Sequence, residues 1–447
     1  MLMEQNIDKC LKMLDGIYNL NEKEKLERIG TFIKSTLSIT PNIYSPTNLK
    51  YLFSYPDPIG IFADFWSNYI NSNVHTEECS PVFTHCEVEM VETLLPLVGY
   101  PEGDGVFYPG GSLSNLASFV LATKREKVDF GKSVVLISEH SHYSIENAVN
   151  ICGIQHIIKI KTTTKGVVDL DHLREMVIKI KDDNLSLIYF CCVLGTTNFG
   201  TFDPVEEIHE IFKEFSVEPW IHFDAAWGGA VYFGKDGSFY RKISLFSDSI
   251  TLDFHKFLSA PLLCSVLLVK NKSVLWEKNL SEQANYLFNI KQNKKYSLSL
   301  KTLQCSREAY AFKLWLMFKN HGFNYFQGLI QRYHDNRTEF RKQLQKHIFY
   351  VVEPQYFNLC MWFIPKEMKV KETIMAYTRE QLEKINRLNL AMYDRIVEDG
   401  FMKVNYSSLN SGPTFIRIVV HHANLTTDII SEMVSYLYKT YEALSVE

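Results

Sequence analysis

Two residues with strong chemical character follow apolar runs in the middle of the chain. Asp224 ends the run in IHFDAAWGG, and Lys256 stands in the apolar segment TLDFHKFLSAP. A buried carboxylate needs a cation or good hydrogen bonds, and the small residues after Asp224 leave room for a flat ligand. A desolvated lysine has a lowered pKa and can form a Schiff base. The structural alternatives are a helix N-cap for Asp224 and a lysine that extends to solvent for Lys256.

Two further segments could contribute to a binding site. The turn YPGGSLSN (residues 108–115) precedes a helical stretch, so its backbone N–H groups suit a phosphate, although a structural turn is the simpler interpretation of this segment alone. The segment SEHSHYS (residues 138–144) follows the apolar run SVVLIS. Its residues His140 and His142 could be metal ligands or members of an ordinary polar loop.

Together these segments predict a cofactor site. A lysine for a Schiff base, an aspartate for a pyridinium nitrogen and backbone amides for a phosphate are what pyridoxal 5'-phosphate requires of a protein. The interval between Asp224 and Lys256 is long enough for the chain to leave one strand end and return at a neighbouring one. The sequence therefore predicts that these groups meet at one edge of a sheet.

The elements that must position these groups alternate along the chain. Short apolar runs predict strands at 133–138, 185–194, 220–225 and 262–269, and helical spacing separates several of them, as at 169–181 and 203–215. Near-continuous apolar strands between helices indicate a mostly parallel sheet with both faces covered, so the fold class is α/β. In such sheets ligands bind at the carboxyl ends of the strands.

The chain divides into three regions that differ in their pattern of apolar and polar residues. We expect an N-terminal helical arm (1–60), a large α/β domain (61–320) and a small α+β domain (321–447). In the last region, 357–365 and 414–420 are typical of strands and 427–443 is typical of an amphipathic helix.

Composition limits the class of protein. The chain has 447 residues, 46% of them hydrophobic and 22% charged, with a net charge of −4, which fits a globular protein and argues against nucleic-acid binding. No apolar run is long enough to span a membrane, and the first residues lack a signal-peptide pattern. We therefore expect a cytoplasmic protein whose nine cysteines are reduced thiols, with no membrane partner.

The sequence resembles the pyridoxal-phosphate-dependent group II amino acid decarboxylases, and glutamate and cysteine sulfinate decarboxylases in particular. The resemblance runs from about residue 85 to 420, and it implies a fold-type I architecture like that of pyridoxal-phosphate-dependent transferases. It rests on these segments in order: FYPGGSLSN, SEHSHYSIENA, LGTTNFGTFDPVEEI, IHFDAAWGGA, DFHKFLSAPLLCSVLLV, NYLFN, LQCSREAYAFKLWLMF, FNLCMWFIP and VNYSSLNSGPTFIRIVV.

The resemblance implies roles for residues around the cofactor. Lys256 matches the lysine that forms the Schiff base, and Asp224 matches the acid paired with the pyridine nitrogen. His142 matches the imidazole stacked on one ring face, and Ala226 would lie against the other, so this interpretation replaces the metal site. Further cofactor contacts are implied for Ser112, Leu113, Ser114, Thr197 and His255.

The resemblance also implies substrate contacts and a partner. Tyr286, in NYLFN, matches the tyrosine of a mobile loop that protonates the quinonoid carbon after decarboxylation. In the family this loop reaches the neighbouring subunit, so a homodimer is implied. Arg417 matches an arginine that binds a substrate carboxylate, for which its forked guanidinium is suited.

The chain departs from the family in two places. Asp253 stands where the family has Asn near the phosphate, and Phe254 stands where it usually has Pro. In the loop at 48–58, which helps define the substrate pocket, the chain has Lys50, Tyr51 and Phe53. Lys50 and Tyr51 could favour an acidic side chain, whereas Tyr51 could equally pack on an apolar one.

The predicted function is decarboxylation of an L-amino acid to an amine and CO2. An acidic substrate (cysteine sulfinate, aspartate or glutamate) is favoured over an aromatic one. The alternatives are an aromatic amino acid decarboxylase, another fold-type I lyase or oxidative deaminase, and an inactive relative that binds a partner. We predict no metal site, and we expect His421 and His422 to be surface or interface residues.

Overall fold

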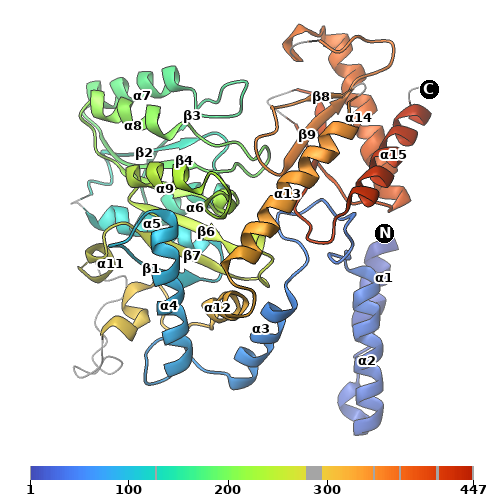
Figure 1. The fold of residues 1–447 in the computed structure, drawn as a ribbon, viewed down its shortest axis with the longest axis horizontal. Helices are drawn as coiled ribbons and strands as arrows, with labels where there is room; N and C mark the ends of the chain where they lie inside the picture. Colours follow the sequence, from blue (N-terminus) through green and yellow to red (C-terminus); the bar gives the residue numbers. More distant parts are fainter. Residues whose placement is uncertain are drawn as a thin grey trace.

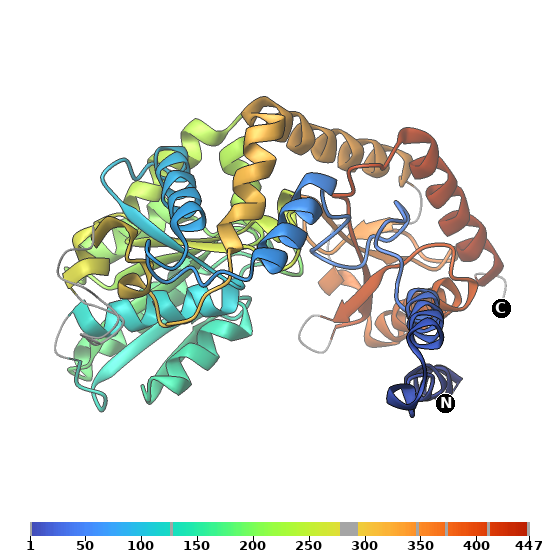
Figure 2. The same ribbon diagram turned by 90° about the horizontal axis from the view of Figure 1, so that it is seen from below.

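Two separate sheets organise the protein. A computed structural model describes residues 2–125, 128–277, 294–345, 348–371, 374–408 and 412–444. Figure 2 shows the larger sheet and its helices at one end of the molecule and the smaller sheet at the other. Helix α12 (Tyr310–His321) packs among the helices of the larger sheet, and α13 (Phe323–Gln343) continues from it toward the smaller one.

The larger sheet has seven strands in the order β1-β7-β6-β5-β4-β2-β3. Neighbouring strands from β3 to β6 are parallel, whereas β7 runs antiparallel to both β6 and β1. The prediction of an α/β fold with a mostly parallel sheet is therefore confirmed. The strand bounds are β1 (Asp104–Tyr108), β2 (Ser133–Ser138), β3 (His156–Ile160), β4 (Ser186–Val193), β5 (Trp220–Asp224), β6 (Ser249–Asp253) and β7 (Ser265–Val269).

Alternate residues of the central strands face two apolar layers. In β4, for example, Cys192 belongs to the core shared with α4, α7 and α8, and Cys191 belongs to the core shared with α5 and α6. This alternation explains why the strands are apolar throughout, since both faces are covered. The helices of this part are α4 (Pro81–Val98), α5 (Gly111–Arg125), α6 (Tyr143–Ile151), α7 (Leu170–Asp182), α8 (Val205–Glu214), α9 (Gly237–Ile243), α10 (Phe254–Phe257) and α11 (Ser273–Glu277).

The smaller sheet is antiparallel, in the order β10-β11-β9-β8. Its core is shared with α13, α14 and α15, and the predicted strands and final helix of this region are confirmed. The elements are β8 (Ile348–Tyr350), β9 (Asn358–Phe363), β10 (Asn405–Ser408), β11 (Thr414–Val419), α14 (Arg379–Asp399) and α15 (Thr427–Leu444). The division of the chain into domains at residues 60 and 320 stays a prediction.

The first part of the chain forms a helical hairpin and a connecting segment. Helices α1 (Leu2–Lys12) and α2 (Glu22–Ile39) pair with each other and project beside the smaller sheet, as Figure 1 shows. Asn21 begins α2 with a capping box, in which Asn21 and Glu24 satisfy each other's backbone N–H groups. The chain then passes the smaller sheet and reaches α3 (Pro58–Ile70), which packs against α12. No helix in the described ranges has the length and apolar character needed to cross a bilayer.

Short 3₁₀ segments complete the described part of the chain. They are η1 (Ile17–Asn19), η2 (Gly228–Phe233), η3 (Ser244–Phe246), η4 (Lys294–Tyr296), η5 (Leu298–Lys301) and η6 (Ile374–Ala376). The segment η2 bears on the functional site, because it follows β5 and lies beside the strand ends. Gly195, just after β4, has a φ of +86°, and a Cβ there would come within 2.7 Å of Gly228. The two glycines let the ends of β4 and β5 approach closely.

Candidate active site

A cavity of about 230 Å³ lies at the carboxyl ends of the strands of the larger sheet. Its lining includes residues that follow β1, β2, β4, β5 and β6, among them Ser112, His142, Thr197, Asp224 and Lys256. These strands all run in one direction, so their carboxyl ends meet at one edge, as the sequence predicts. The structure thus brings most of the predicted cofactor residues together.

Asp224 is the last residue of β5 and is only 5% exposed. Its Oδ1 accepts a hydrogen bond from the Ala226 N–H at 3.2 Å, and its Oδ2 accepts one from Asn115 Nδ2 at 3.0 Å. No ion pair joins Asp224 to a basic side chain within the described ranges. A buried carboxylate that faces a cavity without a cation is suited to a cationic ligand group.

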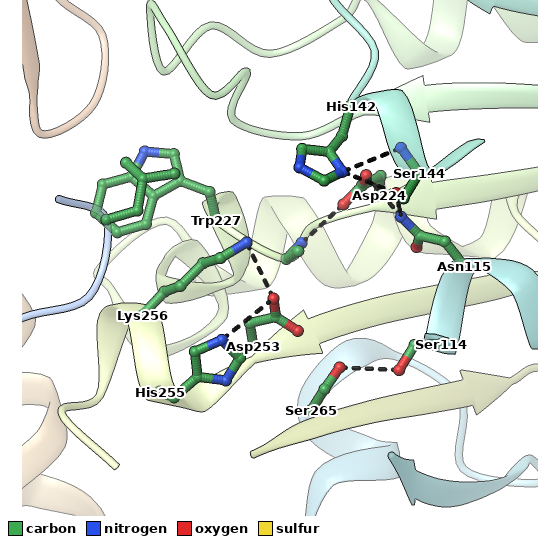
Figure 3. A network of polar contacts seen from close by, with 12 residues as sticks. Ser114, Asn115, His142, Ser144, Asp224, Trp227, Asp253, His255, Lys256 and Ser265 are labelled. Atoms are coloured by element: carbon green, nitrogen blue, oxygen red, sulfur yellow. Dashed lines mark hydrogen bonds and ion pairs between the residues drawn. The ribbon is translucent and has the colours of Figure 1, made fainter. Parts of the chain in front are cut away.

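Lys256 lies in α10, one turn beyond β6, and its Nζ forms an ion pair with Asp253 Oδ2 at 3.0 Å. His255 Nε2 lies 3.7 Å from the same oxygen, as Figure 3 shows. Burial opposes the charge of Asp253, but Lys256 and His255 outweigh it and hold the pKa of this carboxyl below its ordinary value. The surroundings of Lys256 are therefore not only apolar, because a buried carboxylate holds its amine.

Asp253 also lies against the start of α5. A Cβ on Gly111 would meet Asp253 Oδ2 at 2.7 Å, so a larger residue at this turn would have to displace the Asp253 carboxylate. The other carboxylate oxygen, Oδ1, is buried and has no hydrogen-bond partner in the described part of the chain. An ionised carboxylate only accepts hydrogen bonds, so Asp253 cannot itself bind a phosphate, and Lys256 and His255 offset its negative charge beside the helix start.

His142 is the N-cap of α6, and its Nδ1 accepts from the Ser144 N–H at 3.3 Å and lies 2.8 Å from Ser144 Oγ. Burial lowers the pKa of His142, although Asp224 opposes this effect. The imidazole is therefore neutral at neutral pH. A neutral, half-buried ring at the cavity wall can stack on a flat ligand.

The predicted phosphate segment is placed only in part at the cavity. Gly110, Gly111 and Ser112 line it at the start of α5. Ser114 is fully buried instead, and its hydroxyl is 2.8 Å from Ser265 Oγ. Leu113 packs against the apolar core on the α5 side of the sheet.

Arg417, on β11, reaches toward the cavity without lining it. It donates to the Thr197 carbonyl at 3.0 Å and to the Lys50 carbonyl at 3.1 Å, and Thr197 itself lines the cavity. Burial lowers the pKa of Arg417, and its Nε is buried without a partner among the described residues. The guanidinium therefore joins the smaller sheet to the loop that borders the cavity.

The loop residues predicted for substrate binding lie apart from the strand ends. The rings of Tyr51 and Phe53 stack at 4.9 Å, and Lys50 Nζ lies 5.8 Å from the centre of the Tyr51 ring. Tyr51 and Phe53 line a separate, apolar cavity of about 690 Å³ beside Leu37 and Ile43. The structure does not bring these side chains to the cavity of Lys256. Tyr286 lies outside the described residues.

Several residues around the site were not predicted. Asn115 and Trp227 line the cavity, and Ser144 and His222 contact the residues that line it. Asn115 stands at the end of YPGGSLSN, so its closeness to the glycine turn was the available signal. No group of three or more His, Cys, Asp or Glu side chains in the described ranges is arranged to hold a metal ion.

The prediction for His421 and His422 is wrong. Both are almost fully buried, and His421 packs edge-on against Trp227 and lies 3.0 Å from the Leu52 carbonyl. Burial lowers the pKa of His421 to about 4. These histidines follow β11 into the space between the smaller sheet and the N-terminal segment.

Comparisons with known proteins agree with this geometry. The profile described as the pyridoxal-dependent decarboxylase conserved domain matches residues 18–364. The chain is 30% identical over 429 residues to human acidic amino acid decarboxylase GADL1, with 92% of this chain and 80% of the relative covered. It is 29% identical over 425 residues to human cysteine sulfinic acid decarboxylase, with 91% and 83% covered.

A solved structure gives the same result for the fold. The crystal structure of mouse CSAD superposes with a TM-score of 0.82 at 24% identity, and 97% of this chain and 98% of that chain are covered. The structural comparison thus agrees with the α/β fold described above.

Proposed function

Since the chain belongs to the pyridoxal-dependent decarboxylase family, it is a pyridoxal-phosphate-dependent carboxy-lyase, and we propose that its substrate is an acidic L-amino acid. When bound, the cofactor supplies an aldehyde for covalent attachment of amines and a ring that accepts the electrons left by the departing CO2. The residues of the cavity fit such a group, with an amine, an unpaired carboxylate and a glycine-led helix start at its wall.

We assign the covalent attachment of the cofactor to Lys256. Its amine must lose a proton and leave Asp253 before it can act as a nucleophile. We assign the contact with the ring nitrogen to Asp224 and the stacking contact to His142, with Ala226 on the other side. Gly110, Gly111 and Ser112 would hold the phosphate with their backbone N–H groups, and Thr197 and His255 complete the wall.

The relatives of this chain carry the acidic preference, and the buried guanidinium of Arg417 is a candidate contact for a substrate carboxylate. Among the described residues no carboxylate forms an ion pair with it, and backbone carbonyls accept its hydrogen bonds instead. A buried cation without an ion-pair partner next to the cavity loop favours a carboxylate, which every amino acid substrate carries. The relatives named for acidic amino acids and for cysteine sulfinic acid support the same class.

A panel of amino acids tests this proposal. Release of CO2 and amine should be fastest with cysteine sulfinate, aspartate or glutamate and slow with tyrosine or tryptophan. Replacing Arg417 by Met should lower kcat/KM for the acidic substrate by about 100-fold, since a charge-assisted pair is lost, and Arg417→Lys should be intermediate. Arg379→Met, at an exposed arginine of α14, is the control and should have no effect.

An aromatic amino acid as the best substrate would contradict the acidic assignment. It would favour the second candidate, an aromatic amino acid decarboxylase, for which the Tyr51–Phe53 stack on an apolar cavity is the supporting observation. Aldehyde and ammonia as the main products would favour an oxidative deaminase. Colourless protein that cannot take up the cofactor would favour an inactive binding relative.

We also propose that the protein is a homodimer. Helix α3 exposes a group of large apolar side chains, with Phe65 62% and Tyr69 72% exposed, and α2 exposes further apolar residues on a hairpin that stands apart from the larger sheet. Exposed apolar surface on these two helices is typical of an interface. A second copy of the chain is the occupant that the family resemblance implies.

Substitutions on α3 should separate the two copies. Phe65→Glu combined with Tyr69→Glu should convert a dimer to a monomer in analytical ultracentrifugation, since two charges would be buried in the interface. Phe239→Glu, at an exposed aromatic residue of α9, serves as the control and should leave the dimer unchanged. A wild-type monomer, or a dimer that survives the α3 substitutions, would contradict this interface.

A cytoplasmic location fits the state of the cysteines. All nine are free thiols, as expected in a reducing compartment. The role of Tyr286 in protonating the product carbon stays a prediction.

A further inference from the structure

We propose that Asn115 and His222 are positioning residues that hold Asp224 and His142 in the orientation that the cofactor requires. The inference rests on the proposed function, because it concerns the same cavity. It is carried by a continuous set of buried hydrogen bonds that begins in the core of the larger sheet and ends at the cavity wall. Neither Asn115 nor His222 was predicted from the sequence.

Asn115 is the centre of this set. It is buried on α5, and its Nδ2 lies 3.0 Å from Asp224 Oδ2 and 3.0 Å from Ser144 Oγ, as Figure 3 shows. A carboxylate can only accept hydrogen bonds, so the amide nitrogen must face Asp224. The amide oxygen then points the other way, to His222 Nε2 at 3.0 Å.

The second hydrogen of the Asn115 amide orients His142 through the hydroxyl of Ser144. Ser144 Oγ accepts from Asn115, so its own hydrogen is available to His142 Nδ1, which lies 2.8 Å away. One buried amide therefore orients two side chains that follow different strands, β5 and β2. These are the side chains that we assign to the ring nitrogen and to the ring face.

His222 fixes the direction of the bonds. Burial lowers its pKa to about 4, so the ring is neutral and carries a single N–H hydrogen. We place this hydrogen on Nε2, where it satisfies the Asn115 oxygen at 3.0 Å, and Nδ1 then accepts from Ser249 Oγ at 2.8 Å. Ser249 in turn accepts from Trp220 Nε1 at 2.9 Å, and an indole can only donate. Every donor between Trp220 and Asp224 thus points toward the carboxylate.

The direction of these bonds has a consequence for Asp224. If His222 reversed its hydrogen, Asn115 would turn its oxygen toward Asp224, and two hydrogen-bond acceptors would face each other. The direction inferred from these contacts therefore presents an N–H donor to Asp224, the side chain that we assign to the ring nitrogen of the cofactor. A buried hydrogen-bond network whose donors all point in one direction is stable only when each of its polar groups has a partner.

A comparison of two ligands tests the proposal. The probes are pyridoxal phosphate and its analogue in which the ring nitrogen is replaced by C–H, and apparent Kd is measured by absorbance. Wild-type protein should prefer pyridoxal phosphate by about tenfold or more, as for a charge-assisted hydrogen bond. His222→Leu should reduce this preference to about twofold or less, whereas His222→Gln, which can both donate and accept, should retain it.

Two further variants make the result decisive. Tyr232→Phe removes another buried hydrogen bond of the same part of the chain, to Ser244, and should change stability without changing the preference. Asn115→Leu should lose the preference even if His222→Leu fails to fold. The double variant of both positions should lose no more than Asn115→Leu alone, because the two residues act through one path.

The outcomes separate this proposal from the proposed function. Binding is measured without turnover, so wild-type protein that binds neither ligand would overturn both proposals. Wild-type protein with a preference that His222→Leu and Asn115→Leu retain would overturn the positioning role alone. Loss of the preference in Tyr232→Phe would also overturn it, since any buried defect would then have the same effect.

Discussion

Replacement of Lys256 by Ala should abolish decarboxylation, with a loss of about 10⁴-fold or more in kcat, because the nucleophile that anchors the cofactor is removed. Among the described residues that line the cavity, Lys256 is the only primary amine, so no neighbour can take its place. Borohydride treatment of wild-type protein should attach a pyridoxyl group to Lys256, and mass spectrometry of the peptides identifies the site.

The same substitution should also destabilise the fold. It leaves Asp253 buried without its ion pair, which costs roughly 3 kcal/mol of the free energy of unfolding for a buried pair. Lys256→Arg is the matched control, because a guanidinium can keep the ion pair but forms no Schiff base. Both variants should be inactive, and only Lys256→Ala should show a clearly lower Tm. Activity in either variant, or a pyridoxyl group on another lysine, would remove the assignment.

Asp224→Asn should lower the rate of decarboxylation by about 10³-fold, because a neutral amide cannot keep the ring nitrogen of the cofactor protonated. The carboxylate also accepts from both the Ala226 N–H and the Asn115 amide, and an asparagine has one oxygen for these two donors. The rate is measured as CO2 release at saturating cofactor, so that weaker cofactor binding does not mimic a slower reaction.

Asp248→Asn is the control for this substitution. Asp248 lies just before β6, at the opposite edge of the sheet, where it accepts from the Ile221 N–H at 2.9 Å. It should alter stability with little effect on turnover. A near wild-type rate in Asp224→Asn would show that another group keeps the ring protonated.

The fold and the centre of the site follow from the sequence for a physical reason. Apolar runs and their spacing reveal parallel strands, and the polar residues directly after them must meet at one edge, as His142, Thr197, Asp224 and Lys256 do. The antiparallel direction of β7 was not evident, because strands of either direction in a covered sheet are apolar throughout.

The surrounding contacts could not be predicted from the sequence. Asn115 and His222 meet only because α5 packs on the face of β5, and the closeness of Asn115 to the glycine turn does not reveal this contact. Arg417 was expected to point at a substrate, but carbonyl groups of two distant loops accept its hydrogen bonds. The sequence alone suggests polar surface residues at His421 and His422, but in the structure the N-terminal segment covers both. Such contacts join distant parts of the chain.

The antiparallel pairing of β6 and β7 constrains how this chain can change in length during evolution. Residues 254–264 leave β6 and return in β7, and they are fastened at both ends by the Asp253–Ser265 pairing and by the bond from the Phe254 N–H to the Cys264 carbonyl. An inserted residue beside Lys256 would bulge into the cavity or slide β7 by one position. A slide would exchange the faces of β7, whose residues Val266 and Leu267 belong to opposite cores. We therefore expect the part of this stretch that carries Lys256 to tolerate insertions poorly.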